Sequence, residues 1–140
     1  MSRGLGDVYK RQVCTTYSLT EHWQTGTQTR NVPWLNELIP GNFIEISEEL
    51  AQEKGIKKGD KVHIWNRRGS IVVDAMITIR MKPMMINGVK THVVGLPHHF
   101  SWEGMFATGD NVNDLSPNVG DPNSFIPEFK AFLVNVEKAA

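Results

Sequence analysis

Cysteine is almost absent from this sequence, since Cys14 is the only one in 140 residues. A single thiol excludes an internal disulfide framework and any multi-cysteine zinc or iron–sulfur site within the chain. Charge of one sign is also lacking, because fifteen basic residues balance fifteen acidic ones, which argues against nucleic acid as a partner. No apolar run approaches the roughly 20 residues that span a bilayer, so we expect no direct membrane insertion.

The sequence also lacks the short motifs of common catalytic sites. It contains no nucleophile elbow, no Walker loop, no dinucleotide-binding glycine triplet and no carboxylate–histidine spacing that completes a metal site. We therefore assign no catalytic residue and no metal ligand to this chain, and we expect Cys14 to be a small buried hydrophobic residue. The length suffices for one domain with a core and is too short for two.

The first twelve residues differ from the rest of the chain. They show no apolar periodicity, and they lack the apolar stretch of a signal peptide. We expect residues 1–12 to be a non-native or disordered leader and residues 13–140 to form the domain. If the leader is non-native, the natural protein extends upstream.

From residue 13 onward the pattern is typical of a mainly β protein. One helix is expected from Ser47 to Lys54, capped by the Ser47 side chain and ended by Gly55. Pro33 is expected to end regular structure around it. Short strands with one helix and long loops predict a small β-barrel. The expected strands span residues 13–19, 43–46, 61–66, 70–80, 90–96 and 131–136.

The segment from His22 to Arg30 is the strongest candidate for a ligand-binding loop. It contains no aliphatic residue, and burying so many polar groups in a core would require a partner for each. A glycine allows close approach of the backbone, hydroxyls and amides match the edge of a heterocycle, and arginine binds phosphate. A solvated surface loop is the alternative. The predicted contacts are His22, Trp23, Gln24, Thr25, Gly26, Thr27, Gln28, Thr29 and Arg30.

Further candidates lie in the second half of the chain. His98 and His99 are expected to point to opposite faces of a strand, so one would be a functional imidazole and the other a partly buried one. Residues 97–125 lack a clear period, which is typical of a functional loop, and Asn113 and Lys130 lie on or beside it. The turn at residues 67–69 is expected to be a basic hairpin tip that faces solvent.

Four blocks of the sequence resemble one known group of proteins. Their order is similar to that in the molybdopterin dinucleotide-binding C-terminal domain of the dimethyl sulfoxide reductase superfamily. Residues 95–104 and 128–138 look closest to the major, catalytic subunit of formate dehydrogenases, and the resemblance extends over residues 13–139. The four blocks are residues 21–30, 66–69, 113–117 and 127–130.

The resemblance implies a six-stranded double-psi β-barrel of the aspartate-decarboxylase-like fold, with one or two short helices and long loops. It implies that residues 22–30 contact a bis-molybdopterin guanine dinucleotide, which carries molybdenum or tungsten. Asn113 and Lys130 match positions that add polar contacts to this cofactor, and His98 matches a position at the rim of the pocket.

The resemblance also implies that the chain holds the cofactor in an enzyme that oxidises formate to carbon dioxide. The metal ligand, the catalytic residues and an iron–sulfur cluster would lie in upstream domains, so this chain alone would be inactive. Its partners would be those domains and an iron–sulfur electron-transfer subunit, in the periplasm or alternatively the cytoplasm. A nitrate reductase-like enzyme and a freestanding small subunit, as in formylmethanofuran dehydrogenases, are the alternatives.

Overall fold

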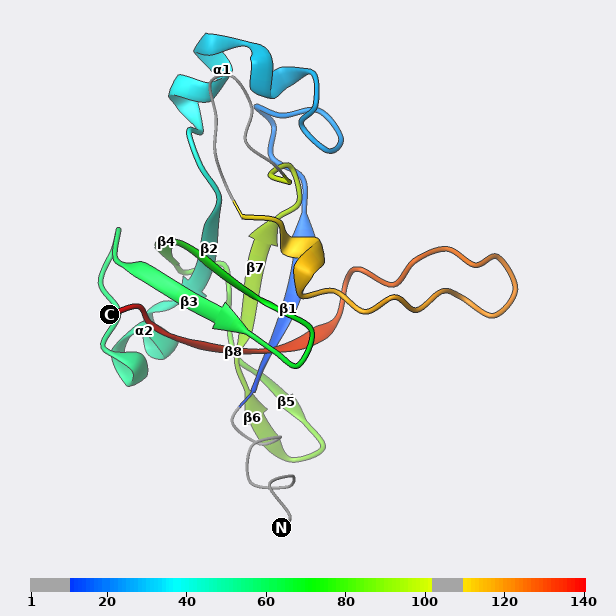
Figure 1. Ribbon diagram of the computed structural model, residues 1–140. Coiled ribbons are helices and arrows are strands. Elements are labelled where there is room, and N and C mark those ends of the chain that lie inside the picture. The colour runs from blue at the N-terminus through cyan, green and yellow to red at the C-terminus, as the bar shows by residue number, and fades with distance from the viewer. Residues whose placement is uncertain (1–10, 102–109) are drawn as a thin grey trace.

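The computed structural model describes residues 11–101 and 110–140, and Figure 1 shows their arrangement. The first strand begins at Gln12, one residue before the expected domain boundary, and residues 1–10 of the expected leader lie outside the described residues. The elements are β1 (Gln12–Tyr17), η2 (Thr29–Asn31), α1 (Pro33–Leu38), β2 (Phe43–Ser47), α2 (Glu48–Lys54), β3 (Lys61–Trp65), β4 (Ser70–Thr78), β5 (Met84–Ile86), β6 (Val89–Thr91), β7 (Val93–Pro97), η3 (Val112–Asp114) and β8 (Phe132–Lys138).

Six of these strands close into a barrel in the order β1-β7-β2-β4-β3-β8. β1 pairs in parallel with β7, and β2 pairs in parallel with β4, whereas the other four neighbouring pairs are antiparallel. Parallel partners require a crossover connection rather than a hairpin. The structure therefore confirms the predicted mainly β, six-stranded double-psi barrel. β5 and β6 form a separate two-stranded hairpin.

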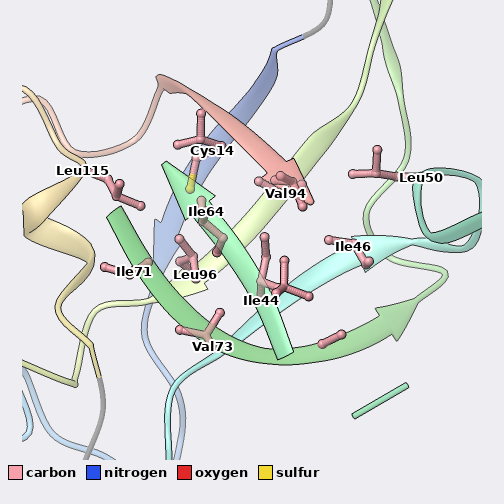
Figure 2. Packing of buried hydrophobic residues seen from close by; sticks show 14 of the residues in the cluster. Cys14, Ile44, Ile46, Leu50, Ile64, Ile71, Val73, Val94, Leu96 and Leu115 are labelled. Carbon is pink, nitrogen blue, oxygen red and sulfur yellow. The ribbon is translucent and has the colours of Figure 1, made fainter. Parts of the chain in front are cut away.

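The core fills the inside of the barrel, and Figure 2 shows its side chains pointing toward one another from several strands. Ile71, Val73 and Ala75 alternate with exposed or half-buried neighbours along β4, as the period of two predicts. Each large aliphatic side chain buried in this way stabilises the fold by about 1.5–3 kcal/mol. Cys14 is fully buried, which confirms its prediction, and burial raises the pKa of its thiol.

Local signals around the two helices have opposite outcomes. α2 is confirmed, because Leu50 N–H donates to the Ser47 hydroxyl at 3.1 Å and Gly55 adopts the left-handed conformation with φ of 65°. The expectation for Pro33 is wrong, because this residue begins α1 instead of ending regular structure. Proline suits the first position of a helix, where its missing N–H would have had no helical partner.

The barrel has two distinct ends along β1. The loop that follows β1 and helix α1 lie at one end, and the β5–β6 hairpin lies at the opposite end (Figure 1). None of the helices in the described ranges has the length and apolar character needed to cross a membrane. The predicted ligand loop therefore sits at the end of the barrel where β1 finishes.

Candidate functional site

The segment between β1 and α1 forms a compact loop with tight turns. Gly26 N–H donates to Trp23 O at 2.8 Å, and Arg30 N–H donates to Gly26 O at 2.9 Å. Two residues of the loop have positive φ, Gln24 at 46° and Gly26 at 79°. These backbone hydrogen bonds give a segment without aliphatic residues a defined shape.

His22 and Thr29 brace the two sides of this loop. The Nε2 atom of His22 lies 3.4 Å from Ile39 O, which can only accept, so Nε2 carries the proton. Its Nδ1 atom then accepts from the Thr29 hydroxyl at 3.1 Å, and that hydroxyl also accepts from Trp23 N–H at 3.1 Å. Both predicted residues thus hold the loop together, and His22 is buried.

His99, rather than His98, joins the loop to the barrel. Its Nε2 atom accepts from Leu19 N–H at 2.7 Å, so Nδ1 carries the proton and donates to Gln24 O. Burial is the main cause that lowers the pKa of His99, and the neighbouring imidazoles His98 and His22 lower it further. The hydrogen bond to Gln24 O opposes them and raises the pKa. A neutral, fully buried His99 is therefore a structural part of the loop.

The expectation that His98 and His99 face opposite sides of a strand is wrong. β7 ends at Pro97, so the alternation of a strand no longer applies to them. Their ring centroids lie 4.6 Å apart, and the backbone N–H of His98 donates to Tyr17 O at 3.2 Å. His98 is half-buried beside the end of β1, whereas His99 is the fully buried one.

Gly26 is required by the packing of the loop on its own domain. A Cβ at this position would overlap the carbonyl oxygen of His99 and lie 2.8 Å from Cδ of Arg30. The close approach that the sequence predicts for a ligand is thus present toward His99. Arg30 itself is 1% exposed, and its guanidinium carbon lies 5.3 Å from the centroid of the Phe100 ring. Burial lowers the pKa of Arg30.

The remaining predicted residues of the loop form its outer face. Their side chains are exposed, and Trp23 retains 61% of its surface. They offer hydroxyl, amide and indole groups that the domain's own packing does not bury. These residues are Trp23, Gln24, Thr25, Thr27 and Gln28.

Lys130 approaches the same end of the barrel from the far part of the sequence. Its Nζ atom donates to Thr16 O at 2.7 Å, near the end of β1. The Thr16 hydroxyl donates in turn to Phe129 O at 3.0 Å. Lys130, His98 and the loop therefore converge where β1 ends, although they are more than 30 residues apart.

Asn113 is exposed on η3, where its N–H donates to the side chain of Asn111 at 2.9 Å. Within residues 11–101 and 110–140, the hydrogen bonds do not link Asn113 to the loop. Three hollows of the described surface, two beside α2 and one beside the β5–β6 hairpin, are lined by none of the predicted site residues. Among the residues that the structure describes, no group of three or more His, Cys, Asp or Glu side chains could hold a metal ion.

Sequence reasoning missed three residues that shape the loop. His99 was considered only as an alternative to its neighbour, and Phe100 and Asn36 were not singled out. Asn36 Nδ2 donates to Arg30 O, and Phe100 packs its ring edge-on to His22 with centroids 5.6 Å apart. The run His98-His99-Phe100, adjacent to a strand, was the available signal for the first two.

Comparison with known protein families identifies the family of this chain. The family model described as "Molydopterin dinucleotide binding domain" matches residues 13–133. The chain belongs to the molybdopterin dinucleotide-binding domain family. The match includes the whole loop and all predicted site residues of this domain.

The relatives of this molybdopterin dinucleotide-binding domain include subunits of formate dehydrogenases. It is 54% identical over 127 residues to formate dehydrogenase subunit alpha of Megalodesulfovibrio gigas. It is 49% identical over 128 residues to the nitrate-inducible formate dehydrogenase major subunit of Escherichia coli K12. Each alignment covers 91% of this chain, and the chain spans only 12% of the length of either relative.

A solved structure supports the fold. Acetylene hydratase from Pelobacter acetylenicus superimposes with a TM-score of 0.71, over 96% of this chain and 19% of that chain, at 15% sequence identity. The molybdopterin dinucleotide-binding domain is thus a barrel that also occurs within a larger chain of different sequence.

Proposed function

We propose that this domain holds a bis-molybdopterin guanine dinucleotide in the catalytic subunit of a formate dehydrogenase. The observation that carries the proposal is the convergence at the end of β1. There an outer face of hydroxyl and amide groups lies on a loop that packs against His99, and the Lys130 ammonium is bonded to Thr16 O nearby. Such a donor set suits a large anionic ligand with many acceptors.

The loop residues divide into two roles in this proposal. Trp23, Gln24, Thr25, Thr27 and Gln28 are exposed and contact the pterin and phosphates. His22, Gly26, Thr29 and Arg30 form the inner side. They hold the outer residues in position through bonds to Ile39, Trp23 and Asn36 and through the close packing of Gly26 against His99 O.

Charge supports the same division. Lys130 is an exposed residue, and its ammonium has further N–H donors beside the one bonded to Thr16 O, so it can meet a phosphate directly. The buried Arg30 guanidinium lies over Phe100 and adds a positive potential to the loop from behind. Asn113 and His98 complete the proposed contacts from η3 and from the end of β7.

The chemistry of the intact enzyme extends beyond this domain. When bound, the pterin and its molybdenum or tungsten supply the two-electron oxidation of formate to carbon dioxide, while this domain binds and orients the cofactor. The similarity to formate dehydrogenase subunits supports formate over nitrate as the substrate. We further propose that the chain is a fragment of such a subunit, works with upstream domains and an iron–sulfur subunit, and is located in the periplasm.

A charge reversal tests the proposal in the full-length catalytic subunit that carries this domain. Lys130→Glu should lower the amount of pterin dinucleotide and metal that co-purifies, because it sets a carboxylate against phosphate. Lys58→Glu is the matched control, since Lys58 is also exposed and lies in the turn after α2. Equal pterin content in the two variants and the unmodified enzyme would contradict the proposal.

A further inference from the structure

A long arm leaves the barrel after η3 and returns to it at β8. Residues 121–130 are all exposed, and Figure 1 shows the arm projecting away from the barrel. The arm is braced within itself, because Asp121 N–H donates to Ile126 O at 3.0 Å and Glu128 N–H donates to Val119 O at 2.9 Å. Since its tip keeps its own shape, the direction of the arm depends on how its two ends are held.

The two ends of the arm carry two proposed cofactor contacts. Asn113 lies on η3, just before the arm begins, and Lys130 lies just before β8, where the arm finishes. Whatever fixes both ends therefore also fixes the relative position of these two side chains.

Asn66 contacts both ends at once. Its side-chain nitrogen Nδ2 donates to Leu115 O at 2.7 Å and to Leu133 O at 3.3 Å. Its side-chain oxygen Oδ1 accepts from Arg68 N–H at 2.8 Å, which holds the amide in one orientation within the turn between β3 and β4. A single side chain thus spans the base of the arm.

The rest of this turn packs on the same place. The Arg68 guanidinium donates from Nε to Leu115 O at 2.9 Å, and a Cβ on Gly69 would lie 2.7 Å from Asp114 O. Arg67 and Arg68 are exposed, as expected for a basic tip, and the turn also rests against η3. Gly69 is needed there for space, because the backbone of η3 occupies the place of a side chain.

We propose that Asn66 is a positioning residue that holds the base of the arm and thereby places Asn113 and Lys130 for the cofactor. This inference rests on the proposed function for the role of those two residues. The bonds to Leu115 O and Leu133 O stand by themselves as its geometric basis. An asparagine that serves only its own turn would need neither bond.

The test uses Asn66→Asp in the 140-residue chain. Aspartate keeps an acceptor for Arg68 N–H but has no N–H for Leu115 O and Leu133 O, and its charge repels both carbonyls. The control is Ile64→Val, a core change in the same region of β3 that lowers stability without touching these bonds. The two variants therefore separate loss of position from general loss of stability.

Two measurements follow the base of the arm directly. Hydrogen exchange of the Leu115 amide, which is bonded to Val112 O, should become about tenfold faster in Asn66→Asp than in Ile64→Val. Trypsin should also cleave after Lys130 faster in Asn66→Asp than in Ile64→Val. Equal rates in the two variants would overturn the inference. Should Asn66→Asp fail to fold, Asn66→Ala removes the same two bonds to Leu115 O and Leu133 O without adding a charge, and the same comparison with Ile64→Val decides.

Pterin content of the full-length subunit supplies the functional measurement. Asn66→Asp should retain less pterin dinucleotide than Ile64→Val, as Lys130→Glu does relative to its own control. If Lys130→Glu lowers the content and Asn66→Asp does not, the positioning role is wrong while the proposed function stands. If neither lowers it, the proposed function fails, and the exchange rates still decide whether Asn66 holds the arm.

Discussion

Replacing Gly26 by alanine should destabilise the domain through two separate effects. The φ of 79° is a left-handed conformation, which costs a residue with a side chain about 1–2 kcal/mol. The added Cβ would also overlap His99 O and press on Cδ of Arg30. Displacing these well-packed groups costs about 1–3 kcal/mol more. We therefore expect Gly26→Ala to lose about 2–5 kcal/mol of unfolding free energy.

Gly59→Ala is the matched control for the backbone effect. Gly59 has a φ of 80°, and nothing lies within 4 Å of the place where its Cβ would stand. This variant should lose only the conformational part, about 1–2 kcal/mol. Urea unfolding followed by tryptophan fluorescence measures both, and the difference between the variants isolates the contact with His99. A difference of 1 kcal/mol corresponds to about 3–5 °C in Tm for a chain of this size.

A local opening of the loop would lower the cost seen in global unfolding. Hydrogen exchange of the Arg30 amide, bonded to Gly26 O at 2.9 Å, detects such an opening. If Gly26→Ala matches Gly59→Ala in stability and the Arg30 amide exchanges no faster, the loop does not pack on His99 as described.

The remaining predictions concern other buried polar groups. The lowered pKa of His99 means that stability should fall as pH drops below about 6.5, because the unfolded chain then binds a proton that the folded chain disfavours. The unfolding free energy, measured with urea across this pH range, should depend less on pH in His99→Gln than in His98→Gln. Identical slopes in the two variants would contradict the role of His99. Arg80→Ala should lower Tm because it leaves the buried Glu45 carboxylate without its partner, and the loss should be smaller in a Glu45→Gln background; additive losses would argue against the pairing. Ser47→Ala should cost about 1 kcal/mol through loss of the α2 cap, and an unchanged denaturation midpoint would count against that cap.

Several features of this domain follow from local sequence. The alternation along β4 and the burial of Cys14 depend on residue type and spacing, because successive residues of a strand point to opposite sides of the sheet. The cap and stop of α2 depend on neighbours within one turn of the helix. The barrel class followed from short strands and long loops, and the ordered blocks indicated the family that the comparison confirms.

The position of single side chains was less accessible from sequence. The sequence could not distinguish His98 from His99, because the choice depends on where β7 ends and on contacts with Leu19 and Gln24. From the sequence, Pro33 is expected to end regular structure, whereas in the structure a helix begins there.

By itself, the sequence determined the barrel class, the capped helix and the polar composition of the loop, since these depend on periodicity and on neighbours a few residues apart. Only the tertiary structure decided that Gly26 faces His99, that Arg30 lies over Phe100, and that Asn66 joins Leu115 to Leu133. Each of those contacts joins residues far apart along the chain, and they meet only after the parallel crossovers of the barrel have closed.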